Sequence, residues 1–151
     1  MKSRQPSANN IDDAMTQTKN ITVEVLQQTD EKGELEVFTW ALLYKRTTDD
    51  TAHLKDNGLP KVGEKIVAGK VIVGLIGKSS TYDEEQLPNC LERHALTQEE
   101  LIAKYGYMFT DKSLVAQNEH EGVVVEAYFE EIDGIRKRAV VVIDTSKNCH
   151  E

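Results

Sequence analysis

Glycines divide the most apolar part of this chain into runs too short for a buried helix. Residues 59–78 contain short β-branched runs that are separated by Gly63, Gly69, Gly74 and Gly77. Glycine supplies the positive φ angles of tight turns and lets neighbouring backbone approach closely inside strands. Parallel strands would need a crossover helix between these runs, and none separates them. The segment therefore predicts strand–turn–strand architecture in an antiparallel fold, with Gly69 in a turn at positive φ.

An alternating pattern near the N-terminus predicts two more strands. Residues 21–25 alternate aliphatic and polar side chains, which is the period of a half-buried strand. A turn over residues 30–33 leads to a second strand over 34–44, and the two strands are expected to form a hairpin. The inward face of the second strand should carry Leu35 and Val37, and its outward face Glu34 and Glu36. The mostly polar residues 45–57 are expected to form a linker.

One helix is expected in the second half of the chain. Thr97 provides an N-cap hydroxyl, and Glu100, three residues later, completes a capping box. Residues 79–93, which precede this helix, are polar and expected to be irregular. An apolar stripe at helical spacing follows the cap and consists of Leu101, Ile102, Tyr105 and Met108.

A β-hairpin is expected near the C-terminus. Residues 123–129 form its first strand and residues 135–143 its second, joined by a two-residue turn at Asp133 and Gly134. The unbroken apolar run over 139–143 needs cover on both faces of the sheet. These elements together predict a mainly β, antiparallel fold with one short α-helix.

Length, charge and cysteine content limit the possible classes of protein. The 151 residues suffice for a polar, flexible tail over 1–19 and one β-rich domain over 20–151. With 18 Lys and Arg against 26 Asp and Glu, the isolated chain should bind nucleic acid weakly. It shows no secretory signal and no apolar run near the ~20 residues that cross a bilayer. Two cysteines favour a reducing compartment, so we expect a cytoplasmic protein without membrane contact.

Candidate metal and catalytic groups are sparse. Cys90 and His94 have a spacing found among zinc ligands, and Cys149 and His150 could add two more. Adjacent residues chelate one ion awkwardly, so no metal site is predicted. Adjacent carboxylates, which are frequent in this acidic chain, point to opposite faces of a strand and cannot form an acid–base couple. We therefore predict no catalytic residues.

One glycine-centred motif resembles a known β-rich module. Residues 62–74 resemble the β-turn-β signature of barrel-sandwich hybrid domains, which include biotinyl and lipoyl carriers. Those carriers attach their prosthetic group to a lysine in Met-Lys-Met or Asp-Lys-Ala, whereas Lys78 lies in Gly-Lys-Ser. A stand-alone barrel-sandwich interaction domain unrelated to transcription is therefore the alternative hypothesis rather than the main one.

The same motif, taken with its surroundings, resembles the β (second-largest) subunit of bacterial-type DNA-directed RNA polymerases. Residues 63–74 match the family's G-x-x-V-x-x-G-D-I-L-V-G without a gap, with Lys70 in place of the usual Asp. Residues 122–127 resemble its block G-x-V-x-D-V, in which the fourth position is Ile or Val. Further blocks follow the family's order at residues 54–59, 96–101, 111–115 and 145–147. The resemblance spans residues 54–151 and maps to the flap, or wall, segment of that subunit.

The resemblance implies a non-catalytic scaffold that borders the RNA–DNA hybrid and the RNA exit path and packs on other polymerase subunits. DNA and RNA would be contacted only in the assembled nucleotidyltransferase, whose Mg²⁺ is bound elsewhere, and this chain would hold no cofactor. The residues expected to contact nucleic acid or neighbouring subunits are Lys78, Arg136, Lys137, Arg138 and Lys147.

Departures from the family pattern refine this expectation. The family's catalytic-lysine block lies beyond residues 145–147, so the chain is not expected to polymerise RNA alone. Bacterial β subunits carry a long insertion, the flap tip that binds sigma factor, where Asp133 and Gly134 close the hairpin at once. Docking of ordinary sigma is therefore not expected. Large phages encode divergent, split polymerases, so a split or phage-encoded form fits the pattern.

Overall fold

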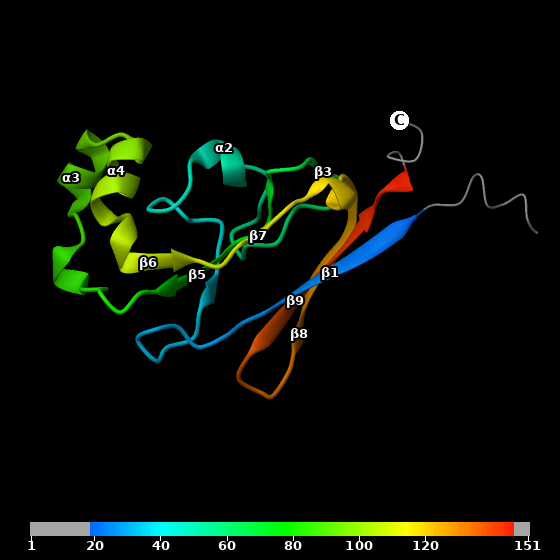
Figure 1. Cartoon of the computed structure of the whole chain (residues 1–151), viewed down its shortest axis with the longest axis horizontal. Coiled ribbons are helices and arrows are strands. Elements are labelled where there is room, and N and C mark those ends of the chain that lie inside the picture. The colour runs from blue at the N-terminus through cyan, green and yellow to red at the C-terminus, as the bar shows by residue number, and fades with distance from the viewer. Residues whose placement is uncertain (1–18, 147–151) are drawn as a thin grey trace, which may run out of the picture.

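Three antiparallel sheets organise residues 19–146, the part of the chain that the computed structural model describes (Figure 1). The largest has the strand order β1-β9-β8-β3, formed by β1 (Asn20–Leu26), β9 (Lys137–Asp144), β8 (Gly122–Glu131) and β3 (Lys65–Ile66). The second consists of β2 (Val37–Phe38), β5 (Leu75–Lys78) and β6 (Phe109–Asp111), and the third of β4 (Val71–Val73) and β7 (Leu114–Val115). Strands hold 35% of residues and helices 22%, and the sheets include a half-barrel, which confirms the mainly β, antiparallel prediction.

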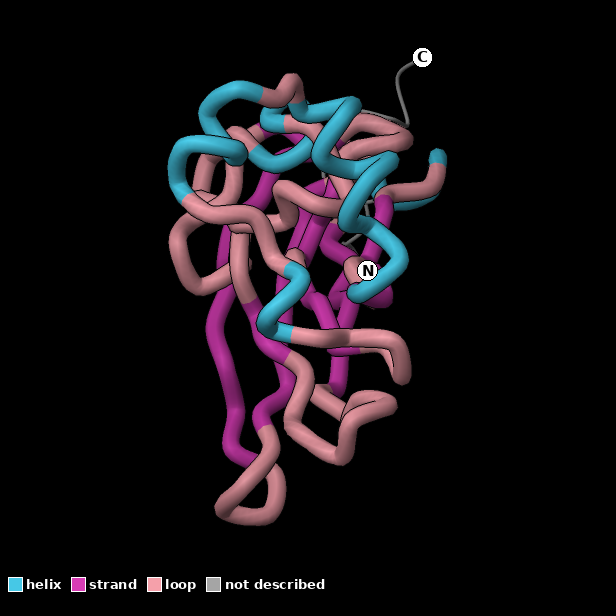
Figure 2. Tube along the Cα trace, turned by 90° about the vertical axis from the view of Figure 1, so that its left-hand side faces the viewer, coloured by secondary structure: helices cyan, strands magenta, loops and turns pink. Residues whose placement is uncertain are grey.

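Helices α3 (Cys90–Ala95) and α4 (Gln98–Tyr105) gather at one end of the molecule with the 3-10 turns η1 (Glu84–Gln86) and η2 (Gly106–Met108), away from the turn of the β8–β9 hairpin (Figures 1 and 2). Helix α2 (Thr48–Thr51) lies nearer the middle, and the 3-10 turn η3 (Asn118–His120) directly precedes β8. Among residues 19–146, no helix is both long and apolar enough to cross a membrane.

The capping box predicted for α4 is confirmed. The Thr97 hydroxyl accepts a 3.1 Å hydrogen bond from the Glu100 backbone N–H, and the Glu100 carboxylate accepts one of 2.8 Å from the Thr97 N–H. Helix α3 was not predicted, because residues 79–93 were expected to be irregular. Its N-cap is Asn89, whose side chain accepts a 2.8 Å hydrogen bond from the Glu92 N–H.

The C-terminal hairpin is confirmed, and β9 lies at the centre of the largest sheet. It pairs with β1 on one side and with β8 on the other, so its aliphatic run is shielded. Ala139, Val141 and Ile143 are fully buried, and Val140 on the other face is 2% exposed. Val142, on the same face as Val140, is half-buried, so one face of the apolar run is fully covered and the other in part.

The predicted two-residue turn of this hairpin is wrong by one residue. The Ile132 N–H donates a hydrogen bond of 3.0 Å to the Arg136 carbonyl, which leaves a three-residue loop. Gly134 adopts φ +77° in it. The loop is wider because the Asp133 carboxylate accepts hydrogen bonds from the backbone N–H groups of Ile135 (3.1 Å) and Arg136 (2.8 Å).

The predicted N-terminal hairpin is wrong in register and length. Strand β1 is confirmed but pairs along its whole length with β9. Only the residues after β1 meet the 34–44 segment, through the bridge between Thr29 and Leu35 and hydrogen bonds between residues 27–30 and 34–36. In that segment Val37 is 54% exposed, whereas Glu36 is 2% exposed. Successive side chains of a strand point to opposite faces. Because β2 pairs with β5 and not with β1, the face that was expected to point inward, with Val37, points outward.

The predicted polar linker is also wrong, because residues 45–57 enter the folded core. They include α2, in which Thr51 is buried, and His53 and Leu54 after the helix are buried as well. The closing bridge joins Leu54 to Pro60. The segment is therefore a packed connection between the sheets.

Two apolar clusters hold the sheets and helices together. The larger fills the space between the strands and consists of Leu59, Ile66, Ile72, Val73, Ala116, Val124, Ala139, Val141 and Ile143. The smaller lies under the helices and consists of Tyr44, Leu101, Tyr105 and Met108. Gly69 adopts φ +94° in the turn before β4, as predicted from the glycine spacing.

Candidate nucleic-acid and subunit interface

The hairpin loop fixes Arg136, the first residue of the predicted basic triplet. Its Nε donates a 3.0 Å hydrogen bond to the Asp133 carboxylate within the same loop. Hydrogen bonds from the Arg136 backbone and side chain, and from the Ile135 backbone, lower the pKa of Asp133 below its usual value. Asp133 therefore stays ionised at neutral pH, and much of the Arg136 charge is balanced locally.

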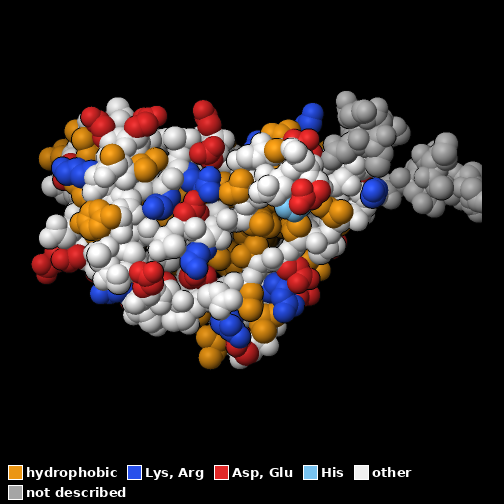
Figure 3. Space-filling model, in the orientation of Figure 1, with side chains coloured by type: hydrophobic (Ala, Val, Ile, Leu, Met, Phe, Trp, Pro, Cys, Tyr) orange, Lys and Arg blue, Asp and Glu red, His pale blue; other side chains and the backbone are white. Residues whose placement is uncertain are grey.

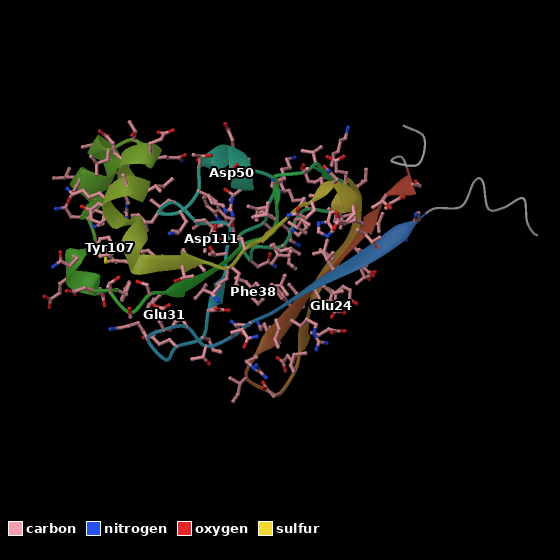
Figure 4. All side chains as sticks on the ribbon, viewed as in Figure 1. Glu24, Glu31, Phe38, Asp50, Tyr107 and Asp111 are labelled. Carbon is pink, nitrogen blue, oxygen red and sulfur yellow. The ribbon has the colours of Figure 1, made fainter. Side chains whose placement is uncertain are left out.

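Arg138 lies between two carboxylates from neighbouring strands. Glu130 stands opposite it on β8 and accepts a hydrogen bond of 3.2 Å from Nη1. Glu24 on β1, labelled in Figure 4, lies 3.8 Å from its Nε. Exposed ion pairs of this kind add little stability, yet they neutralise the guanidinium that a phosphate would need. The space-filling view agrees, since basic and acidic side chains are interspersed on the face shown (Figure 3).

Lys137 differs from its two neighbours. Its ammonium lies 5.6 Å from the Phe129 ring centroid, a distance at which a cation and an aromatic face attract each other. Within residues 19–146, no carboxylate forms an ion pair with it. Of the three cations in the triplet, it is the one whose charge is unpaired by that part of the chain.

Lys78 lies in a different sheet, at the end of β5, so the structure does not bring it together with the triplet. Its ammonium is 2.9 Å from Glu34 and 4.7 Å from the Tyr82 ring centroid. The hydrogen bond to Glu34 raises the pKa of Lys78 above its usual value. The side chain borders a hollow of about 180 Å³ that is also lined by Lys112, Asp30 and Glu36. Lys147 lies outside the described residues.

The cysteine and histidine residues considered as zinc ligands are not brought together among the described residues. Cys90 is exposed and its sulfur lies 3.5 Å from an Arg93 nitrogen, while Cys149 and His150 lie outside the described residues. No cluster of three His, Cys, Asp or Glu side chains within residues 19–146 could hold a metal ion. Among the candidate residues that the structure describes, Lys78, Arg136 and Arg138 are paired with carboxylates and Lys137 is not.

Sequence reasoning missed two apolar hollows beside α2 and α4. One, of about 180 Å³, is lined by Trp40, Leu43, Arg46 and Gln98 among others. The other, of about 360 Å³, shares Leu43 and Gln98 and adds residues of α3 and α4. The available signal was the single tryptophan of the chain, followed by Ala-Leu-Leu. These residues had been assigned to the predicted strand over 34–44.

The comparison with protein families identifies a family for this chain. A family model described as RNA polymerase Rpb2, domain 6, matches residues 7–150. This range includes the charged hairpin, Lys78 and both hollows. A comparison with curated proteins gives no significant match to the chain.

Proposed function

The chain belongs to the RNA polymerase Rpb2 domain 6 family, a segment of the β subunit of multisubunit RNA polymerase, and we propose that it serves there as a non-catalytic wall. Membership implies a role in transcription together with other polymerase subunits. In this proposal the wall borders the RNA–DNA hybrid and the RNA exit path, and it works in the cytoplasm of a cell, in a split or phage-encoded enzyme.

The observation that carries the scaffold role is the pairing of the charges on the β8–β9 hairpin. Arg136 and Arg138 are neutralised by carboxylates of the same chain. Phosphate affinity comes mainly from Lys and Arg charges that displace counterions, and a net charge of −8 opposes it. A segment built this way suits a wall held in place by other subunits better than an autonomous nucleic-acid binder.

The proposed contacts to nucleic acid or to neighbouring subunits are Lys78, Arg136, Lys137, Arg138 and Lys147. Lys137 is the strongest of the described candidates for a phosphate contact, because it would lose no ion pair to a described residue on binding. Catalysis and the Mg²⁺ ion would belong to other parts of the assembled enzyme. Because the hairpin loop is three residues long, we do not expect it to dock ordinary sigma.

A fluorescence-anisotropy titration with a labelled RNA–DNA hybrid tests this proposal at near-physiological salt. The isolated chain should bind weakly, near or below the non-specific range of about 10⁻⁴ to 10⁻⁶ M. Lys137→Ala should weaken the residual binding more than Lys61→Ala, which removes an exposed lysine elsewhere. Sub-micromolar binding by the monomer would contradict the scaffold role and favour an autonomous nucleic-acid-binding domain.

Two further measurements address the assembly and the alternative function. Co-purification from the native source should recover other polymerase subunits. The intact mass of the purified chain should show no prosthetic group on Lys78, whose ammonium is already paired with Glu34. A covalent addition at that lysine would favour the barrel-sandwich carrier instead.

A further inference from the structure

The two hollows beside α2 and α4 are neighbours that share lining residues, and we call them together the Trp40 groove. The first hollow contains Trp40 and Arg46, and the second contains Arg93 and Leu101. Leu43 and Gln98 line both hollows. Figure 1 shows α2 and α4, from which part of this lining comes, on the same side of the molecule.

Gln98, which lines both hollows, is held in place by side-chain hydrogen bonds. The Gln98 side-chain oxygen accepts a 2.9 Å hydrogen bond from the Thr48 backbone N–H, and its nitrogen donates to the Thr48 hydroxyl. These bonds tie the start of α4 to the start of α2. A groove that is fixed before binding loses little conformational freedom when a partner enters it.

Trp40 gives the groove a large apolar surface at its mouth. It is the only tryptophan in the chain, and it is 43% exposed, while Leu42 nearby is 2% exposed. Isolated exposed apolar side chains are ordinary, but a tryptophan beside an apolar hollow is a typical centre of a protein–protein interface. Such centres are enriched in Trp and Arg, the two residue types that this groove combines.

The charge of the groove is opposite to the charge of the chain. Its charged side chains are Arg46 and Arg93, and within residues 19–146 no carboxylate lines it. The chain as a whole carries 26 acidic against 18 basic residues. Arg46 is paired with Asp111 at 2.6 Å, a residue labelled in Figure 4, so its charge is engaged. Arg93 is exposed and its guanidinium contacts the Tyr44 hydroxyl and the Cys90 sulfur, but it forms no ion pair with a described carboxylate, so its charge is not neutralised there.

We propose that the Trp40 groove docks an extended acidic segment of another polymerase subunit, with an apolar side chain beside Trp40 and a carboxylate on Arg93. The apolar lining around Trp40 favours an apolar side chain of the partner segment, and Arg93 favours a carboxylate next to that side chain. This inference rests on the proposed place of the chain in a multisubunit polymerase. It adds the chemistry of one partner segment, which the hybrid-binding test does not address.

Fluorescence of the single tryptophan provides a direct test with the full-length chain. Three synthetic peptides without tryptophan are titrated to millimolar concentration: Asp-Asp-Leu-Leu-Asp-Asp, Asp-Asp-Ser-Ser-Asp-Asp and Lys-Lys-Leu-Leu-Lys-Lys. Only the first combines leucines with carboxylates, and it alone should give a saturable change in Trp40 emission. Its affinity should fall as salt is added, because one contact is an ion pair at the surface.

Matched charge reversals locate the contact. Arg93→Glu should weaken binding of the acidic leucine peptide at least about tenfold, which is the effect of a lost charge-assisted hydrogen bond replaced by repulsion. Lys61→Glu changes the net charge equally at an exposed site outside the groove lining and should leave the affinity within about twofold. Circular dichroism of both variants should match the parent, since both positions are exposed.

Four outcomes would overturn the proposal. They are no saturable change with the acidic leucine peptide, equal binding of the lysine peptide, equal weakening by the two charge reversals, and a Trp40 spectrum that depends on chain concentration alone. The last would assign the groove to a second copy of this chain. Because the peptides contain no nucleic acid, failure here leaves the wall proposal standing, and tight hybrid binding would leave this result unaffected.

Discussion

The backbone of Gly74 runs directly against the backbone of Thr39. The Thr39 N–H donates a 3.0 Å hydrogen bond to the Gly74 carbonyl, and the Gly74 N–H donates one of 2.9 Å to Gly58. A Cβ atom on Gly74 would overlap the carbonyl oxygen of Thr39. The obstacle is a backbone atom, which cannot rotate away as a side chain can. Only glycine at position 74 therefore lets the connection between β4 and β5 pack against the segment after β2.

Gly74→Ala should therefore lower the free energy of unfolding by at least about 2 kcal/mol, because strands must separate to admit one methyl group. Urea denaturation measures this change. Gly33→Ala is the control: Gly33 has φ +82° but no atom within 4 Å of an added Cβ. It should cost only about 1 to 2 kcal/mol of backbone strain. Equal losses of unfolding free energy in the two variants would mean that the close approach of the Thr39 backbone does not explain the need for glycine at position 74.

Glu36 tests the register that the structure assigns to residues 34–44. Its carboxylate is 2% exposed, accepts a 2.9 Å hydrogen bond from the Gln28 N–H and lies 3.7 Å from the Lys112 ammonium. Glu36→Ala should cost about 1 to 3 kcal/mol, because the Gln28 N–H loses its acceptor. Glu34→Ala removes a carboxylate that is 61% exposed and should cost less than about 1 kcal/mol. If Glu34→Ala lost more stability than Glu36→Ala in thermal or urea melts, the result would favour the register in which Glu36 faces solvent.

Thr97→Ala should destabilise the fold by about 1 kcal/mol, because the Glu100 N–H loses its capping acceptor. The reciprocal bond from the Glu100 carboxylate would weaken with it. Thr97→Ser keeps the hydroxyl and should change the stability by no more than a few tenths of a kcal/mol. Urea melts of both variants provide the measurement, and superimposable curves for the alanine variant and the parent would show that the cap contributes nothing.

Features encoded within a few residues could be predicted from the sequence. The capping box at Thr97 depends on one residue three positions away, and the positive φ of Gly69 on a local turn. The β8–β9 hairpin likewise joins neighbouring segments. The burial of Glu36 could not be predicted in this way, because Lys112 approaches it from 76 positions along the chain, from 36 to 112.

The candidate site shows the same limit. The basic triplet at residues 136–138 is visible in the sequence. The pairing of Arg136 with Asp133, three residues away, could have been predicted from local sequence. The pairing of Arg138 with Glu24 was not, since it depends on β1 lying beside β9. The Trp40 groove depends on α2 meeting α4 through Gln98, a contact between segments that were expected to be a linker and a separate helix.

His53 is the titratable group whose burial has the clearest consequence for stability. It is 4% exposed, and its Nε2 forms a hydrogen bond with the Val71 carbonyl. A carbonyl only accepts, so Nε2 carries the proton of the neutral ring. Its buried Nδ1 has no hydrogen-bond partner among the described residues. Protonation would place an N–H there without an acceptor, and burial lowers the pKa of His53 below its usual value of 6.5.

The fold should therefore lose stability as the pH falls below about 6.5, where the unfolded chain binds a proton at His53 and the folded chain does not. Above that pH the contribution is fully present. Below it the loss grows by at most about 1.4 kcal/mol per pH unit until the folded-state pKa is reached. His53→Gln keeps an N–H donor for Val71 and does not titrate, so its urea-melt stability should be flatter between about pH 7.5 and 5.5. The Asp30 and Asp133 carboxyls, whose pKa values are lowered from 3.8, titrate below this window and cannot mimic the effect. If parent and variant lose stability in parallel, His53 is not the group that takes up the proton.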